Sequence, residues 1–180
     1  MYLPKAIFID RDGTIGGTDK VVYPGEFQLF PFVDNTISRL KEAGNLIFSF
    51  TNQPGISRGE ATREDFEKEL KSFGFDQIYL CPHQHNEGCL CRKPSAAMLS
   101  QAALENDLNL TECIVIGDRW TDMLAAQEAG CMKILVKTGA GAEAFQKYKN
   151  NDYYGKYAEV TPDYIASNFK EAVDWVISAT

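Results

Sequence analysis

Short apolar runs alternate with longer segments of helical periodicity along most of the chain. Runs at residues 5–9, 45–50, 77–80, 113–116 and 132–136 have the length and composition of buried strands. Segments with helical spacing lie between and after these runs, at residues 32–43, 62–73, 95–106, 121–129, 143–151 and 168–178. Such alternation gives right-handed crossovers and a mostly parallel sheet that helices cover on both faces. The sequence therefore predicts an α/β fold with a doubly wound, Rossmann-like core.

Length and charge limit what else the chain can be. Its 180 residues are 44% hydrophobic, which suffices for one core, so we expect a single domain over residues 1–180. The formal charge is -7, from 18 basic and 25 acidic residues without a basic stripe, which argues against nucleic acid or a membrane surface as partner. No apolar run approaches the roughly 20 residues of a membrane span, and the start does not read as a signal peptide. We therefore expect a cytoplasmic protein.

Polar side chains follow three of the predicted strands at the point where each strand ends. Asp10 and Asp12 come after the first strand, Thr51 and Asn52 after the second, and Asp118 after the fourth. In open parallel sheets, ligands bind beyond the carboxyl ends of the strands, so these segments are expected to meet on one rim. Two acids placed so close together repel each other unless a cation offsets their charge. The pattern therefore predicts a metal site at this edge.

These residue types match the needs of phosphoryl transfer. Asp10 can act as nucleophile and metal ligand, Asp118 can supply a second carboxylate for Mg²⁺, and Asp12 can act as general acid and base. Thr51 can donate to phosphoryl oxygens, and Lys93 can neutralise their charge. Each residue alone has a common structural explanation, such as a solvated loop acid or a turn. Their joint order after successive strands favours the catalytic interpretation.

Four motifs of the chain resemble those of the haloacid dehalogenase (HAD) superfamily. They are Asp10-Arg11-Asp12-Gly13-Thr14, Thr51-Asn52-Gln53, Lys93, and Gly117-Asp118-Arg119-Trp120-Thr121-Asp122. The resemblance implies that Asp10 becomes phosphorylated and that Asp12 is the general acid/base. It also implies Mg²⁺ held by Asp10, the backbone carbonyl of Asp12, and Asp118. An acid two residues after the nucleophile is the phosphatase and mutase pattern, which disfavours dehalogenation.

A loop at residues 81–91 contains three cysteines and two histidines. Zn²⁺ takes four such ligands in a tetrahedron, and the spacing predicts Cys81, His83, Cys89 and Cys91 as that set, with His85 spare. A closed set of four makes the ion structural. The alternative, disulfide pairing, is disfavoured by the expected cytosolic setting and the intervening histidines. Cys113 and Cys131 are expected to be buried small residues outside any site.

This loop resembles that of zinc-containing HAD phosphatases, namely the D-glycero-D-manno-heptose-1,7-bisphosphate phosphatases and the histidinol-phosphate phosphatases. The five-residue spacer between His83 and Cys89 matches the histidinol type, whereas the Arg58-Gly59 pair matches the heptose type. On the heptose interpretation, Arg58 and Arg92 contact the substrate. We expect three further substrate contacts, from Asn52, Gln53 and Arg119. Residues 16–23, within a predicted hairpin or flap at residues 15–30, depart from the heptose pattern, so they bear on which sugar is bound.

Several functions are compatible with these motifs. The favoured one is a Mg²⁺-dependent phosphatase, most like the heptose 7-phosphatases, that hydrolyses a small phosphorylated sugar or metabolite through an aspartyl-phosphate. Histidinol phosphate is an alternative substrate, and a phosphotransferase or mutase would use the same intermediate. A zinc-stabilised binding protein with a vestigial site is a further alternative, which the intact acid pair and Lys93 oppose. The lack of a large insertion predicts an open site without a bulky cap domain, and we expect a monomer.

Overall fold

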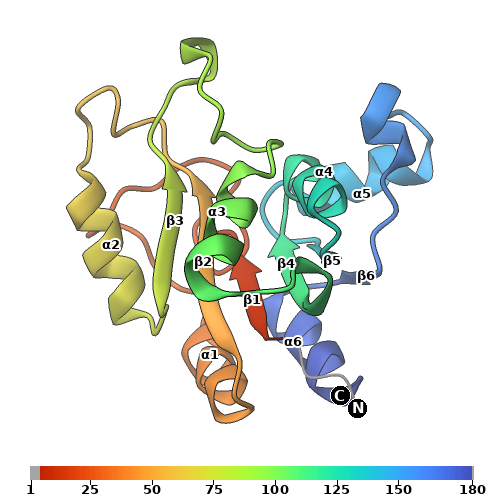
Figure 1. Ribbon diagram of the computed structural model, residues 1–180, viewed down its shortest axis with the longest axis horizontal. Coiled ribbons are helices and arrows are strands. Elements are labelled where there is room, and N and C mark those ends of the chain that lie inside the picture. Colours follow the sequence, from red (N-terminus) through yellow and green to blue (C-terminus); the bar gives the residue numbers. More distant parts are fainter. Residues whose placement is uncertain (1–4, 180) are drawn as a thin grey trace.

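The computed structural model describes residues 5–179, and six strands within that range form one parallel sheet in the order β3-β2-β1-β4-β5-β6 (Figure 1). The α/β prediction is confirmed. The elements in chain order are β1 (Ala6–Ile9), α1 (Val33–Glu42), β2 (Leu46–Asn52), α2 (Arg63–Ser72), β3 (Gln77–Cys81), η1 (His85–Glu87), α3 (Ala97–Asn106), η2 (Leu110–Glu112), β4 (Cys113–Gly117), α4 (Trp120–Ala129), β5 (Met132–Val136), α5 (Gly141–Lys149), η3 (Gly155–Glu159), β6 (Tyr164–Ala166) and α6 (Phe169–Ser178).

The predicted elements exist, and their ends follow ordinary local chemistry. The Thr62 side chain accepts a hydrogen bond from the Asp65 backbone and caps α2, and Asn168 caps α6 in the same way. Gly130, with φ of 78°, ends α4 in the left-handed region that glycine adopts without strain. Strand β6 was not predicted, because its three residues are too few to show a pattern. It joins the sheet beside β5 and extends it at that edge.

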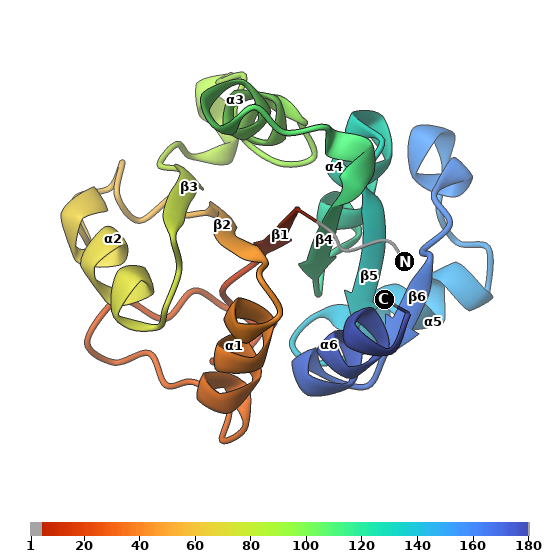
Figure 2. The ribbon, with the colours of Figure 1, turned by 60° about the horizontal axis from the view of Figure 1, so that its bottom comes forward.

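Helices cover both faces of the sheet (Figure 2). On one face, α1 and α6 bury Leu40 and Phe169 against strand residues such as Ile7. On the other, α3 and α4 bury Leu99 and Ala125 against the opposite side of the same strands. The strands are thus apolar on both faces, as a doubly wound sheet requires. A third apolar cluster joins α4 to α5 and to the segment after it.

The register of the central strands brings the predicted site together. Ile9, the last residue of β1, lies opposite Ser49 of β2 and Ile116 of β4. The residues that follow these strands therefore leave the sheet at the same edge, the upper one in Figure 1. The zinc loop rises from the end of β3 at this edge as well. The convergence predicted from strand order alone is what the structure contains.

Residues 15–30 form a flap and not a hairpin. Among the described residues of this segment, pairing is limited to single bridges between Gly16 and Asp12 and between Gly16 and Leu29. Gly17, Pro24 and Gly25 interrupt any regular strand here, because proline cannot donate to a ladder and glycine favours turns. No domain is inserted elsewhere in residues 5–179; the flap and the zinc loop border the site, and Tyr157 of η3 lines it as well.

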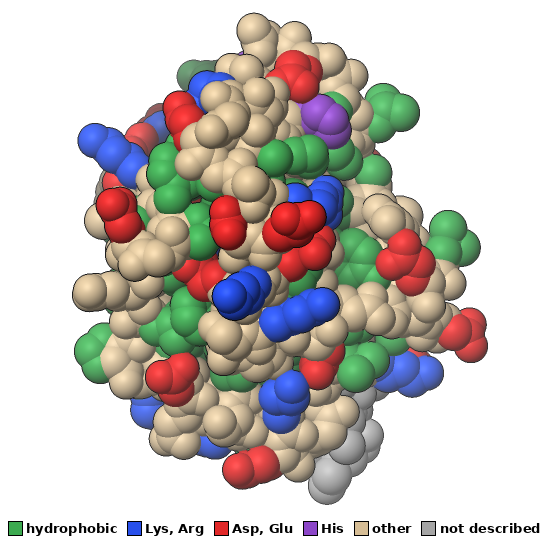
Figure 3. Space-filling view, turned by 90° about the vertical axis from the view of Figure 1, so that its left-hand side faces the viewer, with side chains coloured by type: hydrophobic (Ala, Val, Ile, Leu, Met, Phe, Trp, Pro, Cys, Tyr) green, Lys and Arg blue, Asp and Glu red, His purple; other side chains and the backbone are tan. Residues whose placement is uncertain are grey.

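The face of the molecule that includes α2 carries interspersed acidic and basic side chains (Figure 3). Several of them pair across the surface, including Lys41 with Asp76 at 2.9 Å and Arg63 with Glu67 at 3.5 Å. Exposed pairs of this kind contribute little stability. None of the helices within residues 5–179 has the length and apolar character that crossing a bilayer requires.

Candidate active site

A cavity of about 300 Å³ opens at the carboxyl edge of the sheet. It is lined by most of the residues predicted from the sequence, namely Asp10, Asp12, Thr51, Asn52, Arg92, Lys93 and Arg119. They come from four separate segments of the chain, which the parallel sheet brings to one place. Gln53, Arg58 and Asp118, also predicted, are not among the residues that line the cavity.

Lys93 is held between two buried carboxylates. Its Nζ lies 3.0 Å from Asp10 and 2.6 Å from Asp122, and it also donates to the backbone carbonyl of Phe50 at 2.7 Å. Burial alone would lower the pKa of Lys93, but Asp10 and Asp122 more than offset this, so its pKa is raised. The ammonium therefore stays charged beside Asp10, where it can neutralise a phosphoryl group.

Asp118 completes a cluster of three buried carboxylates with Asp10 and Asp122. Ligand oxygens of the three lie within 4.8 Å of one another. Burial and the repulsion from Asp10 and Asp122 raise the pKa of Asp118 to about 9. Such a shift shows that the cluster is strained when all its members are ionised, and a divalent cation would relieve that strain. The donor set is the all-oxygen type that Mg²⁺ prefers, so the residues fit the metal.

Two glycines leave room around the Asp118 carboxylate. A Cβ added at Gly13 or at Gly139 would come within 2.2 Å of Asp118 Oδ2. Gly13 also has a φ of 82°, which disfavours any other residue there. Asp118 Oδ2 accepts a hydrogen bond of 2.8 Å from the Ala140 backbone, which fixes the carboxylate in this narrow space. The turn after β1 and the turn after β5 therefore both need glycine where they approach Asp118 Oδ2.

Asp12 lines the cavity, and its carboxylate is surrounded by hydrogen-bond donors. Its Oδ1 accepts from the Arg11 guanidinium at 2.7 Å and from the Val22 backbone at 3.2 Å. Its Oδ2 accepts from Gln53 Nε2 at 2.8 Å. Burial nevertheless raises the pKa of Asp12, with the Arg11 charge opposing it. A carboxyl group with a raised pKa is better suited to deliver a proton at neutral pH.

Arg11 supports Asp12 from inside the fold. Its guanidinium is fully buried, pairs with Glu69 of α2 at 2.7 Å, and lies 3.8 Å from the centroid of the Phe27 ring. It also donates to the Val22 carbonyl at 2.7 Å, which ties the flap to the first motif. Buried charges are tolerated only when they are paired and hydrogen-bonded, as this one is. Arg11 thereby fixes the position of Asp12 without lining the cavity.

The second motif, Thr51-Asn52-Gln53, both lines the cavity and holds neighbouring residues in position. Asn52 Oδ1 accepts from the Lys93 backbone at 3.1 Å, which fixes the segment that carries the lysine. Gln53 is fully buried, and its Nε2 donates to Asp12 and, at 2.8 Å, to Thr51 Oγ1. The structure therefore places Gln53 where it orients the acid/base residue, in contrast to the expected substrate contact. Thr51 keeps its place on the cavity wall.

Arg58 and Arg119 fasten the flap. Arg58 donates to Glu60 at 2.8 and 2.9 Å and to the Tyr23 hydroxyl at 3.3 Å, and that hydroxyl in turn donates to Glu60. The guanidinium of Arg119 donates to the backbone carbonyl of Asp19. Arg58 was expected to bind substrate; it is not among the residues that line the cavity, and the contact stays a prediction. Arg119 both lines the cavity and holds the flap.

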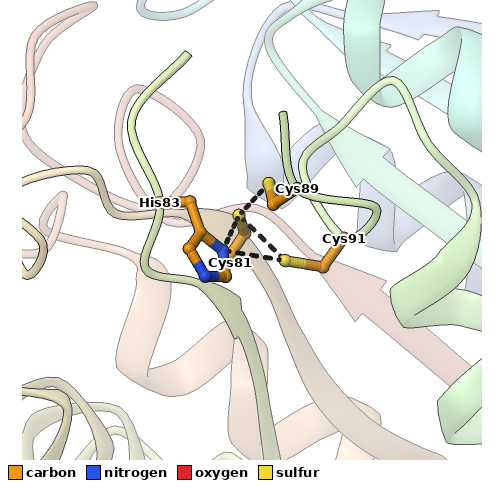
Figure 4. A group of neighbouring side chains, drawn as sticks. All are labelled: Cys81, His83, Cys89 and Cys91. Atoms are coloured by element: carbon orange, nitrogen blue, oxygen red, sulfur yellow. Dashed lines mark hydrogen bonds between the residues drawn. The ribbon is translucent and has the colours of Figure 1, made fainter. Parts of the chain in front are cut away.

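The zinc loop brings the four predicted ligands together (Figure 4). Cys81 Sγ lies 3.6 Å from Cys89 Sγ and 3.1 Å from Cys91 Sγ, and His83 Nδ1 lies 3.5 Å from Cys81 Sγ and 3.3 Å from Cys91 Sγ. Ligands of a tetrahedral zinc ion with bonds of about 2.3 Å stand about 3.8 Å apart. The donor types and spacing therefore fit Zn²⁺, and all the cysteines are free thiols. His85 lies outside the set and lines the reaction cavity instead.

The zinc loop is connected to the segment that carries Lys93 and to the loop that follows the second motif. Arg92 follows the last ligand and donates to the His83 carbonyl at 3.2 Å, and Lys93 follows Arg92. On the other side, the Ser57 backbone donates to the Pro82 carbonyl at 3.2 Å. The metal loop therefore contributes to the position of Lys93. Cys113 and Cys131 are buried in the core, as expected.

Asp122 is a functional residue for which the sequence analysis assigned no role. One of its oxygens pairs with Lys93, and the other accepts from the Arg119 backbone at 3.0 Å. Both oxygens are therefore engaged, which leaves Asp10 and Asp118 as the better metal ligands. Asp122 is the third residue of α4, three positions after the N-cap Arg119. An acid at this position is a known helix-capping signal, and the sequence contained that signal. The pairing of Asp122 with a lysine 29 positions earlier was not evident from the sequence.

Known proteins resemble the chain in sequence. A family model described as HAD-hydrolase-like matches residues 90–172. The D-glycero-beta-D-manno-heptose-1,7-bisphosphate 7-phosphatase of Helicobacter pylori J99 is 34% identical over 185 residues, covering 96% of this chain and 97% of the relative. The D-glycero-alpha-D-manno-heptose-1,7-bisphosphate 7-phosphatase of Campylobacter jejuni is 40% identical over 160 residues, covering 81% and 91%.

A solved structure agrees with this relationship. The D,D-heptose 1,7-bisphosphate phosphatase of B. bronchiseptica, crystallised with magnesium and phosphate, superposes with a TM-score of 0.82 at 29% identity. The match covers 98% of this chain and 99% of that one, so the whole architecture is shared. Relatives above 30% identity over nearly the full length carry the same assignment. The chain therefore belongs to the HAD superfamily of hydrolases and, within it, to the heptose-1,7-bisphosphate phosphatase family of phosphoric monoester hydrolases.

Proposed function

We propose that the protein is a Mg²⁺-dependent phosphatase that removes the 7-phosphate of a D-glycero-D-manno-heptose 1,7-bisphosphate. The observation that carries this proposal is the contact between Lys93 Nζ and Asp10 at 3.0 Å, beside Asp118, inside a cavity that residues from both the zinc loop and the flap line. Relatives named for this substrate support the heptose over histidinol phosphate. We further propose that residues 1–180 act as one domain, as a monomer in the cytoplasm.

The chemistry assigns one task to each group. The Asp10 carboxylate attacks phosphorus, the bond from phosphorus to the sugar oxygen breaks, and Asp12 gives its proton to the departing oxygen. Asp12 then takes a proton from water, which attacks the aspartyl-phosphate and releases inorganic phosphate. Lys93 and Thr51 stabilise the phosphoryl oxygens throughout. Mg²⁺, held by Asp10, the Asp12 backbone carbonyl and Asp118, would offset their negative charge.

The zinc ion has a structural task in this proposal. Cys81, His83, Cys89 and Cys91 would occupy all four positions of a tetrahedral ion and leave none for substrate. The ion would fix the loop from which Arg92 and Lys93 extend. Its presence can be tested without any assay of activity, by metal analysis of freshly purified protein, where we expect about one zinc per chain.

The test is phosphate release from heptose 1,7-bisphosphate by purified protein with Mg²⁺, compared with Asp10→Asn. We expect Asp10→Asn to lose activity by at least about a thousandfold, because the amide is a poor nucleophile. Asp174→Asn, on the distant helix α6, is the matched control and should keep full activity. Phosphorus NMR of the products separates hydrolysis from transfer to a second hydroxyl. Normal phosphate release by Asp10→Asn would refute the proposed mechanism.

A further inference from the structure

Trp120 fastens the segment between α5 and β6 to the rim of the reaction cavity. It lies two residues after Asp118 and is 5% exposed. Its Nε1 donates to the Tyr157 carbonyl at 2.9 Å, and its ring stacks on Tyr153 with centroids 4.5 Å apart and planes 5° from parallel. In Figure 1 this segment stands at the same edge of the molecule as the zinc loop. The aromatic segment is therefore held by a residue next to a proposed metal ligand.

Tyr157 lines two cavities that adjoin each other. The first is the reaction cavity, and the second, of about 480 Å³, lies between the start of α4, α5 and η3. The two share Arg119, Thr121 and Tyr157 as their common wall. Tyr153 and Tyr154 line the outer cavity but not the reaction cavity. Tyr157 is half-buried, with its ring 6.4 Å from that of Tyr153, so packing limits its movement.

The groups expected to act on the phosphate lie together at one place beside the reaction cavity. Asp10, Lys93 and Asp118 gather at the end of β1 and β4, where the phosphoryl group must lie for attack. The rest of a substrate must then contact the remaining walls. Among the described residues that line this cavity, Tyr157 is the one with a phenyl, phenol or indole ring. Aromatic rings with a polar end suit ligands that carry both C–H faces and hydroxyl groups, as sugars do.

We infer that Tyr157 is a specificity-determining residue, whose ring binds the carbon chain of a phosphorylated sugar while Asp10 acts on the phosphate. This inference rests on the proposed phosphatase function and adds the residue that selects a sugar over other phosphoesters. The role extends the site to residues 152–160, a segment that no motif assigns to it. The outer cavity is a consequence of the same aromatic packing and is not needed for binding.

The test compares two substrates, heptose 1,7-bisphosphate and acetyl phosphate, which contains no sugar. Tyr157→Leu keeps an apolar side chain against Tyr153 but removes the ring. We expect its kcat/KM for the heptose to fall about tenfold, mostly through KM, while turnover of acetyl phosphate stays within twofold. Tyr157→Phe, which keeps the ring, should retain heptose turnover within about threefold. Tyr154→Ala, at an 82% exposed residue of the outer cavity, is the matched control and should change neither substrate.

Each contrary result has one meaning. Equal losses on both substrates, no loss for Tyr157→Leu, or an equal loss for Tyr154→Ala would overturn the assignment of Tyr157. Melting temperatures of all variants separate a loss of binding from a loss of folding. Failure of the proposed heptose substrate is distinct, because the wild type would then leave heptose bisphosphate intact while hydrolysing other phosphoesters. The same comparison would then be made on a sugar phosphate that the wild type does hydrolyse, and a wild type that hydrolyses none would refute the inference.

Discussion

The zinc loop and the carboxylate cluster are both groups of metal-binding residues, but they are assembled in opposite ways. The four zinc ligands lie within eleven residues of one another, and a short loop suffices to bring them together. The carboxylates and Lys93 come from three distant segments, and only the order of the parallel strands makes them neighbours. A local chelate can be identified from spacing, whereas a site built by topology requires the sheet to be known.

The two groups also differ in what they contribute. The carboxylate cluster opposes folding, since burial and mutual repulsion penalise its charges. The zinc ligands, once they bind an ion, stabilise the fold, because a metal that binds only the folded state shifts the equilibrium toward it. We therefore expect changes in the first group to reduce activity with little effect on stability, and changes in the second to reduce both.

Among variants that keep the Asp10 nucleophile, the largest effect is expected for Asp122→Asn. The substitution removes the buried negative charge that holds Lys93 at 2.6 Å, while the Asp10 carboxylate remains to neutralise the ammonium, so the main loss is the fixed position of Lys93. We expect kcat to fall by about a hundredfold or more, measured as phosphate release at saturating Mg²⁺. Zinc content should stay at the wild-type value. Loss of zinc from this variant would erase the distinction between the two groups.

Cys89→Ser should reduce activity and stability together. Serine cannot replace the thiolate ligand, so the loop that carries Arg92 and Lys93 would lose its fixed position. We expect the zinc content to fall well below one per chain, the melting temperature to drop by about 10 °C, and the activity to drop about tenfold. His85→Ala, in the same loop but outside the ligand set, should keep its zinc and its melting temperature. Unchanged stability of Cys89→Ser would show that the loop needs no metal.

The carboxylate cluster should make the effect of Mg²⁺ on stability depend on pH. With a folded-state pKa of about 9 against an ordinary value of 3.8, Asp118 keeps a proton that the unfolded chain loses. Its contribution to stability is therefore full below about pH 4 and is lost as the pH rises through 9. Protein dialysed free of Mg²⁺, which keeps its zinc, should melt lower at pH 9 than at pH 6. Added Mg²⁺ should raise the melting temperature by at least about 3 °C more at pH 9.

Asp118→Asn is the control for this titration. It carries no titrating carboxyl at that position, so the extra stabilisation by Mg²⁺ at pH 9 should disappear. Differential scanning calorimetry at the two pH values gives both measurements. A pH-independent effect of Mg²⁺ in the wild type would mean that the cation binds elsewhere.

The smallest effect is expected for Tyr23→Phe on the outer rim. Its hydroxyl joins the flap to Glu60 and Arg58, but exposed charged pairs and hydrogen bonds of this kind contribute at most about 1 kcal/mol. We expect KM to rise by no more than about fivefold, with kcat and zinc content unchanged. Tyr154→Phe, at an exposed tyrosine outside the flap, serves as the control. A larger effect would mean that the contacts of the flap, and not the residues at the edge of the sheet, limit the rate of the reaction.

Sequence patterns predicted most of the fold and part of the site. Strand β5 was predicted with its observed ends, because Met132 to Val136 form a run that is apolar except for Lys133. The three-residue strand β6 gave no pattern, and its pairing with β5 depends on the rest of the sheet. Asp10, Asp12 and Asp118 were identified because each follows a strand. Asp122 was not, because its role depends on Lys93.

Arg58 shows what a resemblance of motifs leaves out. The Arg58-Gly59 pair suggested a substrate contact, but in the folded chain Nε and Nη2 of Arg58 donate to Glu60 and Tyr23. Such competition between protein partners and ligand is invisible in a linear sequence. Gln53 shows the same limit, because its buried contacts with Asp12 and Thr51 arise only after β2 is placed beside β1.

The buried Arg11 links the acid/base residue to the side of the molecule away from the substrate. Glu69, its partner, belongs to α2, a helix that contributes no residue to the lining of the reaction cavity. Substitutions on that helix can therefore change the acidity of Asp12 without altering any group that contacts the substrate. Natural variants could adapt the working pH of this enzyme through a helix surface while the reacting residues stay the same.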